Sequence, residues 1–247
     1  MKTMSGVSAL ALALLLGACT GGASNTVDAA KGPESLQRIA APNNANWADT
    51  VVETQEGYLM GNPNAPVKLV EYASITCPHC AEFSRQAGER LRQYVQTGQV
   101  SWEYRPFMIF PTDPGVFMLL RCQGAQSFFA VSDQLYRDQE QWMGRVRAVP
   151  EAQLQQTEQM APTQRAAFLT QAAGLDQFFR QRGMPEAQVG QCLANQAELQ
   201  RLAAISARAT AEERVQGTPT FIINGELVEG ADSWQELEPA LQARLGG

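Results

Sequence analysis

The sequence contains one histidine, His79, among its 247 residues. A metal site built from several histidines is therefore excluded, and so is a Ser-His-Asp triad built on any other histidine. The chain also lacks a basic block or a basic-aromatic run, and its net charge of -6 is spread along its length. We expect no nucleic-acid partner, because such partners need a concentrated positive surface.

The mature chain also has no apolar run of the roughly 20 residues that a membrane-spanning helix needs. A short apolar segment at residues 7–16 follows the positive charge of Lys2. This pattern predicts a signal peptide over residues 1–18, and therefore export of the protein. The remaining composition, with 45% hydrophobic and 18% charged residues, is ordinary for a globular protein.

The end of the signal segment, Leu16-Gly17-Ala18-Cys19, resembles the lipobox of bacterial lipoproteins. In these proteins the cysteine is lipid-modified and becomes the new N-terminus, so the resemblance implies lipidation of Cys19. The acyl chains would attach the protein to a membrane without a spanning helix. We expect a location on the periplasmic side of a bacterial cell envelope; an ordinary signal peptide cleaved nearby is the alternative.

Four cysteines remain after Cys19, and an even number in an oxidising compartment favours one catalytic pair and one structural pair. Two of them lie in a C-P-H-C tetrad, Cys77-Pro78-His79-Cys80, which can cycle between dithiol and disulfide. The other two, Cys122 and Cys192, are expected to form a structural disulfide. Two separate buried thiols are the alternative for that pair.

The surroundings of the tetrad predict an α/β fold of the thioredoxin type. A strand at 67–73 precedes the tetrad, a helical pattern follows it, and residues 100–107 alternate as a second strand. Much later, residues 220–228 predict two strands that turn at Asn224-Gly225, and a capping box at Ser233 begins a final helix. The order β-α-β and then β-β-α is the thioredoxin topology.

Apolar pairs at helical spacing fill the long segment between these two halves. We therefore divide the chain as follows: signal peptide 1–18, flexible tether 19–46, thioredoxin-like domain 47–110 and 217–247, and a helical insertion at 111–216. The tether is inferred from its richness in glycine, alanine, serine, asparagine and proline.

Cys77 is expected at the N-terminus of its helix, where backbone N–H groups and the helix dipole favour a thiolate. Pro78 suits the first helical turn, and the His79 ring can donate to the sulfur or carry positive charge beside it. Because a stabilised thiolate makes the disulfide a better oxidant, the tetrad should donate disulfides.

Cys80 is expected to lie deeper and to resolve mixed disulfides between Cys77 and a client protein. Alternation along the strand places Glu71 on the same face as Leu69, mid-strand and close to the catalytic turn. A buried Glu71 would have a raised pKa and could exchange protons with Cys80. A carboxylate at a partly open strand is the alternative.

Pro219 precedes the second β unit, where a cis proline of this fold would face the tetrad. A cis bond would expose the backbone of Thr218 for pairing with an unfolded client. A trans turn proline is the alternative, since few X-Pro bonds in folded proteins are cis.

These residues together resemble the DsbA-like, thioredoxin-fold protein-disulfide oxidoreductases of bacteria. The resemblance covers residues 50–245 and implies that Cys77 is the nucleophile, Cys80 the resolving cysteine, Glu71 the buried acid and Pro219 the cis proline. It implies reduced, unfolded exported proteins as clients and a quinone-linked membrane protein as redox partner. It implies no cofactor and no metal, because the cysteine pair itself carries the redox chemistry.

Threonine before the cis proline departs from the best-known oxidase of the family, which has valine there, and is similar to thioredoxin and to the disulfide isomerases. A reductase or isomerase of the envelope is therefore the first alternative function. A chaperone-like binding lipoprotein, in which the tetrad is a structural staple, is the second.

Overall fold

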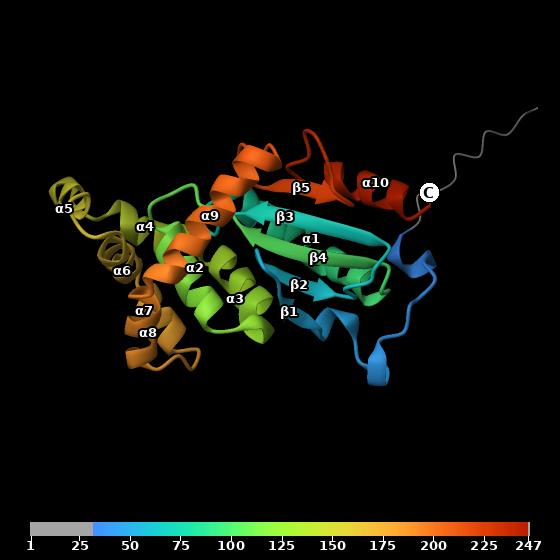
Figure 1. The fold of residues 1–247 in the computed structure, drawn as a ribbon, viewed down its shortest axis with the longest axis horizontal. Helices are drawn as coiled ribbons and strands as arrows, with labels where there is room; N and C mark the ends of the chain where they lie inside the picture. Colours follow the sequence, from blue (N-terminus) through green and yellow to red (C-terminus); the bar gives the residue numbers. More distant parts are fainter. Residues whose placement is uncertain (1–31, 247) are drawn as a thin grey trace, which may run out of the picture.

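The computed structural model describes residues 32–246, and its centre is a six-stranded mixed sheet in the order β1-β2-β4-β3-β5-β6 (Figure 1). Strands β3 (Val67–Ala73) and β4 (Val100–Pro106) are parallel and are joined by helix α1 (Pro78–Gln96). This is the β-α-β unit expected from the sequence, and α1 ends where Gly98 adopts a positive φ of 76°.

The second unit pairs directly with the first, because β5 (Thr220–Ile223) lies antiparallel to β3. A tight turn at Asn224 and Gly225, whose φ values are 51° and 84°, leads to β6 (Glu226–Leu227). Helix α10 (Trp234–Arg244) follows with a capping box at its start. The thioredoxin fold predicted from the sequence is confirmed, and both halves of it share one sheet.

Two short strands extend the sheet beyond β4. They are β1 (Val51–Glu53) and β2 (Tyr58–Gly61), and the sequence pattern does not predict β2. The two form an antiparallel hairpin, and β2 pairs with β4. Their short length explains the omission, because four residues carry too little alternation to identify a strand.

Part of the segment assigned to the tether is packed against the domain. Residues 32–46 contain two 3-10 turns, Pro33–Ser35 and Pro42–Asn44. The backbone N–H of Ile39 donates to the carbonyl of Thr97 at 2.8 Å, beyond the C-terminal end of α1. These residues therefore extend the folded part of the chain beyond the boundary drawn from composition.

Eight helices lie between β4 and β5 in the sequence and gather mainly at one end of the sheet, forming what we call the helical region (Figure 1). None of the helices between residues 32 and 246 is both long and apolar enough to cross a membrane. Their bounds are α2 (Asp113–Cys122), α3 (Ala125–Arg137), α4 (Gln139–Arg147), α5 (Glu151–Thr157), α6 (Pro162–Ala172), α7 (Leu175–Arg180), α8 (Glu186–Leu193) and α9 (Gln196–Glu212).

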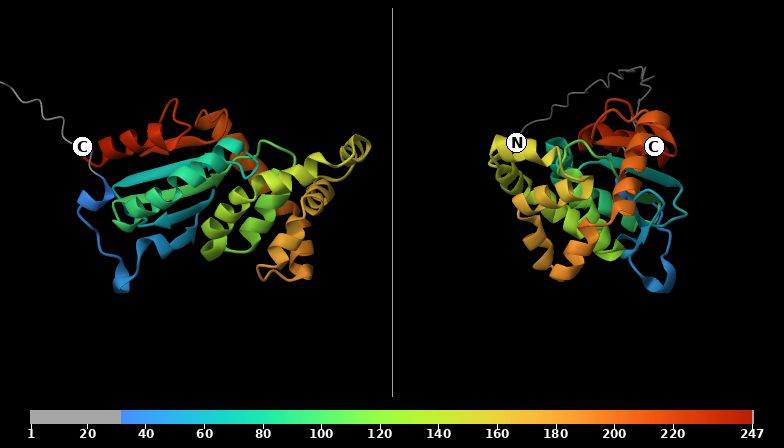
Figure 2. Two further views of the ribbon diagram at one scale, coloured as in Figure 1. Left: turned by 180° about the vertical axis from the view of Figure 1, so that it is seen from behind. Right: turned by 60° about the vertical axis from the view of Figure 1, so that its left-hand side comes forward.

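The sheet is covered differently on its two faces. Helix α1 covers one face, as the view from behind shows (Figure 2), and the main core with Leu69 and Phe83 lies beneath it. Helix α9 crosses part of the other face, where Ile205 and Ala209 pack with Tyr72 in a second apolar cluster. The period of two along β3 accounts for this division, since Leu69 and Tyr72 point to opposite faces.

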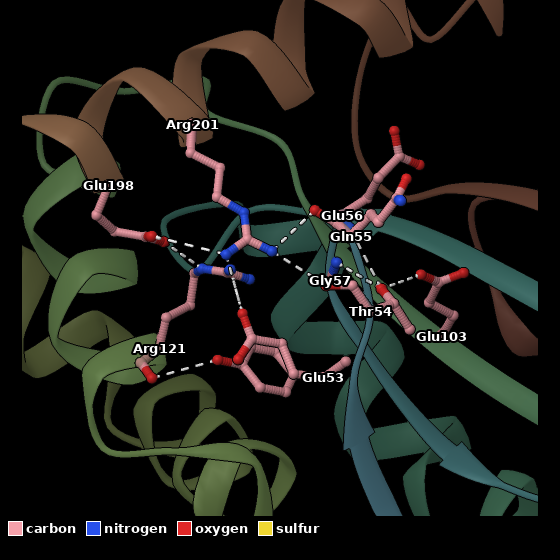
Figure 3. Close-up of polar contacts among 10 residues, drawn as sticks. Glu53, Thr54, Gln55, Glu56, Gly57, Glu103, Arg121, Glu198 and Arg201 are labelled. Atoms are coloured by element: carbon pink, nitrogen blue, oxygen red, sulfur yellow. Dashed lines mark hydrogen bonds and ion pairs between the residues drawn. The ribbon is translucent and has the colours of Figure 1, made fainter.

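Helix α9 is also held to the β1–β2 turn by an ionic network, which we define as Glu53, Arg121, Glu198 and Arg201 (Figure 3). Arg121 of α2 pairs with Glu53 at 3.0 Å and with Glu198 of α9. Arg201 pairs with Glu53 at 3.0 Å and donates to backbone carbonyls of the turn. The network therefore connects the first hairpin to both ends of the helical region.

Candidate active site

The C-P-H-C tetrad begins immediately after the turn that follows β3. Cys77 is the N-cap of α1, with the extended φ and ψ of -76° and 123°, and Pro78 occupies the first helical turn. The carbonyl of Cys77 accepts the first helical hydrogen bond from the N–H of Ala81 at 3.1 Å. This geometry aims the unpaired N–H groups of the first turn at the sulfur of Cys77.

Hydrogen bonds lower the pKa of Cys77 from its usual 9.0 to about 5. The largest contribution is the hydrogen bond from the thiol of Cys80, and the backbone N–H groups of Cys80 and His79 add to it. Desolvation acts in the opposite direction, because only 3% of Cys77 is exposed. Cys77 is therefore largely a thiolate at neutral pH.

His79 acts through its backbone rather than through its ring. Within residues 32–246 its imidazole has no hydrogen bond to either sulfur, and the residue is exposed. The expectation that the ring itself donates to Cys77 therefore has no counterpart in this geometry. The main-chain N–H supplies the contact, because His79 lies in the first turn of α1.

Cys80 and Glu71 are buried behind Cys77. Cys80 has no exposed surface, and burial raises its pKa well above the usual 9.0, an effect that the charge on Cys77 increases. Glu71 is 2% exposed, and burial raises its pKa to about 8. The two groups are thus protonated at neutral pH and electrostatically coupled to each other.

One polar side chain holds the carboxyl group of Glu71 in place. The indole Nε1 of Trp102, on the neighbouring strand β4, donates to Oε2 of Glu71 at 2.9 Å. This hydrogen bond lowers the pKa of Glu71 but does not outweigh desolvation. Nothing in the spacing of Trp102 along the sequence connects it with Glu71.

The loop just before β5 brings Thr218 and Pro219 to the tetrad. Thr218 lies 141 residues after Cys77 in the sequence. The Thr218–Pro219 peptide bond is cis. When Cys77 is protonated, its thiol donates to the carbonyl oxygen of Thr218 at 3.2 Å. The hydroxyl of Thr218 is buried and has no hydrogen-bond partner among the described residues.

A second buried carboxyl group, that of Asp113, fixes the turn on which the tetrad begins. Asp113 has no exposed surface and accepts hydrogen bonds from the hydroxyls of Ser74 and Thr76 at 2.9 Å. It also accepts from the backbone N–H groups of Ile109 at 2.8 Å and Phe110 at 3.0 Å. Burial raises its pKa, and these donors counteract that effect.

We call this set, Asp113 with Ser74 and Thr76, the Asp113 clamp. It joins the turn before Cys77 to the start of the helical region. The sequence shows Asp113 only as an acidic residue in the first turn of a helix, so only the folded chain shows its contact with Ser74 and Thr76.

Gln139 provides a second tie between the helical region and the tetrad. Its amide Nε2 donates to the carbonyl of Ile75 at 2.8 Å and to that of Cys77 at 2.9 Å. Nearby, the hydroxyls of Tyr104 and Tyr136 are 2.8 Å apart, and Tyr136 donates to the carbonyl of Ser74 at 3.2 Å. Side chains of the helical region thus fix the backbone around Cys77 by hydrogen bonds.

The second cysteine pair lies away from the tetrad. Cys122 and Cys192 form a disulfide that joins α2 to α8, and their Cα atoms are 6.1 Å apart. Cys122 is exposed and Cys192 buried. Cys19, the expected lipidation site, and the predicted signal peptide lie outside the described residues. Between residues 32 and 246 no group of three or more histidine, cysteine or acidic residues is arranged to hold a metal ion.

Comparison with known families and curated proteins gives a consistent picture. The family model described as "Thioredoxin" matches residues 53–243. A protein of Rickettsia bellii with the provisional name of protein-disulfide oxidoreductase is 25% identical over 173 residues, which is 69% of this chain and 58% of the relative. A protein of Rickettsia prowazekii with the same provisional description is 26% identical over 69% of this chain and 55% of the relative. The chain thus spans little more than half the length of these relatives.

Solved structures show the same arrangement of helices and strands. A protein-disulfide isomerase from Novosphingobium aromaticivorans has a TM-score of 0.73 and 34% identity, covering 76% of this chain and 97% of that one. The alpha-DsbA1 of Wolbachia pipientis has a TM-score of 0.61 and 18% identity, covering 87% and 96%. Oxidised BdbD from Bacillus subtilis, at 16% identity and a TM-score of 0.55, covers 83% of this chain and all of its own.

Proposed function

The chain belongs to the thioredoxin family, among its DsbA-like protein-disulfide oxidoreductases, and from this we propose that its tetrad introduces disulfides into client proteins. The observation that carries the proposal is the asymmetry of the cysteine pair. Cys77 lies at the helix N-terminus with donors around its sulfur, whereas Cys80 is fully buried beside Glu71. This asymmetry stabilises the reduced form of the pair and makes its disulfide an oxidant.

The reaction proceeds through a mixed disulfide and transfers two electrons. A client thiolate attacks the sulfur of Cys77 in the Cys77–Cys80 disulfide, and Cys80 leaves as a thiolate. A second client thiolate then attacks the first client sulfur and releases Cys77. The client becomes a disulfide, the tetrad becomes a dithiol, and the two client protons are taken up by the tetrad or by solvent.

Glu71 serves the first of these steps. The thiolate of Cys80 forms in a buried place where its pKa is raised well above 9.0, so it needs a proton at once. Glu71, whose pKa is about 8, holds a proton at neutral pH and can donate it. The released Cys77 needs no proton, because its surroundings stabilise the anion.

The test is oxidative refolding of reduced ribonuclease by the purified protein. Wild type should accelerate the return of ribonuclease activity, and Cys77→Ser should abolish the acceleration because no mixed disulfide can form. Cys122→Ser with Cys192→Ser is the matched control, since it removes the other disulfide and should preserve the acceleration. Refolding that continues at the wild-type rate in Cys77→Ser contradicts the proposal.

A reductase or isomerase is the second candidate, and Thr218 favours it together with the 34% identity to a protein described as a protein-disulfide isomerase. The direction of electron flow follows from the reduction potential of the tetrad. Equilibration with glutathione measures that potential. A potential well above that of thioredoxin supports the oxidase, and one close to thioredoxin's favours the reductase.

A chaperone-like binding role predicts a different result in trapping. In a Cys80→Ala variant whose Cys77 is first joined to glutathione, a client thiolate displaces glutathione and forms a mixed disulfide with Cys77. A client with a single cysteine has no second thiolate to release it, so it should stay covalently bound to an oxidoreductase. A variant that traps no reduced client, while wild type still binds unfolded proteins, favours the binding role.

The proposed place of action is the periplasmic side of a bacterial envelope, with a lipid anchor on Cys19. Reduced exported proteins would be the clients, and a membrane thiol-disulfide protein would reoxidise the tetrad. The observation that supports this is the signal-like segment ending in Cys19. Labelling of growing cells with a radioactive fatty acid should mark the wild type and leave Cys19→Ala unlabelled.

A further inference from the structure

A cleft of about 430 Å³ lies directly beside the tetrad, between α1, α3 and α4. Its floor includes Thr76 and Gln139, the residues that adjoin or hold the backbone of Cys77. Pro78 of the tetrad forms one side of it. The left view of Figure 2 shows α1 in front of the sheet with the helical region beside it. Any chain bound covalently to Cys77 must therefore pass close to this cleft.

The cleft carries a positive charge although the whole chain is acidic. Three arginines and one glutamate line it: Arg85, Arg137, Arg147 and Glu140. Arg85 is paired with Glu82 on its own helix. Arg137 and Arg147 are exposed, and neither has an ion-pair partner within residues 32–246. Two guanidinium groups are thus available to an incoming anion beside a cysteine that reacts with other proteins.

The lining is also partly apolar. Phe110 is 48% exposed at the edge of the cleft, and Met143 lies partly buried within it. An exposed phenylalanine next to unpaired arginines fits a peptide that combines a carboxylate with apolar atoms, because each part of such a peptide finds its complement.

A second hollow near the tetrad has a different charge. It follows the loop of Thr218 and Pro219 and is lined by Arg214, Glu229 and Asp232. Arg214 lies 3.9 Å from Glu229 and is paired with it, which leaves Asp232 as the excess charge. The two hollows therefore favour opposite charges in a bound chain.

We propose that the cleft between α1, α3 and α4 binds an acidic side chain of the client protein, near the client cysteine that joins Cys77. This inference rests on the proposed function, since it concerns the mixed-disulfide complex. Arg137 and Arg147 bind the carboxylate, and Phe110 contacts the neighbouring apolar atoms. Clients with aspartate or glutamate close to the reactive cysteine are then oxidised faster than neutral ones.

The experiment compares two peptides that differ only in charge. Each has two cysteines and an aromatic residue for detection, and a glutamate near the first cysteine in one is replaced by glutamine in the other. The measured quantity is the ratio of kcat/KM for the glutamate peptide to kcat/KM for the glutamine peptide. We expect a ratio of about two to five at low salt, the range for one or two exposed ion pairs. The ratio should fall toward one as salt rises.

The decisive variant is Arg137→Gln with Arg147→Gln, in which the ratio should fall to about one. Arg137→Lys with Arg147→Lys should retain part of it, because lysine keeps the charge but loses the bidentate geometry. The matched control is Arg38→Gln, an exposed arginine with no ion pair in the described chain, near the other end of α1. A helix of 19 residues spans roughly 28 Å, so Arg38 is remote from the cleft.

The outcomes separate this inference from the proposed function. Failure of the wild type to oxidise even the glutamine peptide overturns the function and the inference with it. Oxidation of both peptides at equal kcat/KM overturns the inference alone and leaves the oxidase in place. A ratio that persists in the double glutamine variant, while its circular dichroism spectrum matches the wild type, also overturns it. A charge reversal, Arg137→Glu with Arg147→Glu, should make a lysine peptide the better substrate.

Discussion

Glu71 and Cys80 in the active site and Arg121 in the ionic network are all enclosed by the fold, but they have different partners. Glu71 and Cys80 are 2% and 0% exposed, and no cation pairs with either among the described residues. Arg121 of the ionic network is equally enclosed, with 3% of its side chain exposed, but two glutamates accompany it. Burial without a counter-charge shifts a pKa and prepares a group for proton transfer, whereas burial with counter-charges fixes two elements together.

The largest expected effect comes from removing the unpaired acid. Glu71→Gln keeps the shape and the acceptor for Trp102 but removes the proton, so oxidation of a dithiol peptide should slow by about a hundredfold. Rapid-mixing measurements of peptide oxidation at pH 7 check this. An unchanged rate shows that water or another group protonates Cys80. Glu238→Gln is the control, since Glu238 is a partly exposed carboxylate paired with Arg90 and is not among the groups that shift the pKa of Glu71.

The same variant should be more stable than the wild type at alkaline pH. Folded Glu71 keeps its proton up to about pH 8, whereas in the unfolded chain its pKa is near 4.5, so stability falls as pH rises through this window. The loss is on the order of 3 kcal/mol at pH 8. Urea unfolding at pH 5 and pH 8 should show this slope in the wild type and a flatter profile in Glu71→Gln.

The next largest effect is expected from a change in the Asp113 clamp. The carboxyl group of Asp113 is buried, and neutral donors satisfy its hydrogen bonds. Asp113→Asn replaces an acceptor oxygen by an NH₂ group that faces the N–H groups and hydroxyls, so we expect a loss of about 2–3 kcal/mol. The pKa of Cys77 should also change, because the turn before the tetrad is released. Urea unfolding and the pH dependence of thiolate absorbance at 240 nm measure the two effects. A stable variant with an unshifted pKa of Cys77 would mean that the clamp is structurally dispensable.

Reduction of the tetrad disulfide should change the free energy of unfolding by a smaller amount, and the change should depend on pH. The pKa of Cys77 is lowered to about 5 in the folded dithiol, so its stabilisation is complete above pH 9 and disappears as pH falls through 5. At pH 7 we expect the reduced form to gain about 1–2 kcal/mol over the oxidised form, after allowance for solvent screening.

Unfolding of both redox forms at pH 4 and pH 7 tests this in the Cys122→Ser, Cys192→Ser background, where only the tetrad changes state. The gain should be absent at pH 4. A gain of equal size at both pH values contradicts a thiolate origin.

The smallest effect is expected in the ionic network. Arg201 is 37% exposed on its side chain, so Arg201→Gln should cost about 1 kcal/mol or less in unfolding free energy. The pKa of Cys77 should be unchanged, because the network fixes α9 and the β1–β2 turn without touching the tetrad. A shifted thiolate titration in Arg201→Gln would remove the distinction between the two regions.

Much of the fold could be predicted because its signals are local. The strand at Val67, the helix after Cys77 and the turn at Asn224 and Gly225 each follow from the period of neighbouring residues or from turn chemistry. β2 was not predicted because it is only four residues long and is defined by its pairing with β4. The packed residues 32–46 were hidden in the same way, since their composition is that of a tether while their hydrogen bonds reach residues near 97.

The residues of the active site also fall into those that local sequence patterns predict and those that only the folded chain reveals. The tetrad, Glu71 and Pro219 were identified from motif and strand alternation, and the structure brings all of them together. The Asp113 clamp and the contact of Trp102 with Glu71 were missed, because they join residues 31 to 39 positions apart in the chain. The role expected of the His79 ring differs from its place in the structure, since helix geometry delivers a backbone N–H to Cys77 instead.

The sequence by itself determined the chemistry that this protein carries. Two cysteines at the start of a helix, with proline and histidine between them, indicate a redox pair when a strand precedes them and a helix follows. Only the tertiary structure decided how acidic each sulfur is, because a pKa depends on burial and on donors that come from distant segments. It also brought together the arginines of the cleft that we propose for the client, since they come from α1, α3 and α4, and only packing places those helices beside the tetrad.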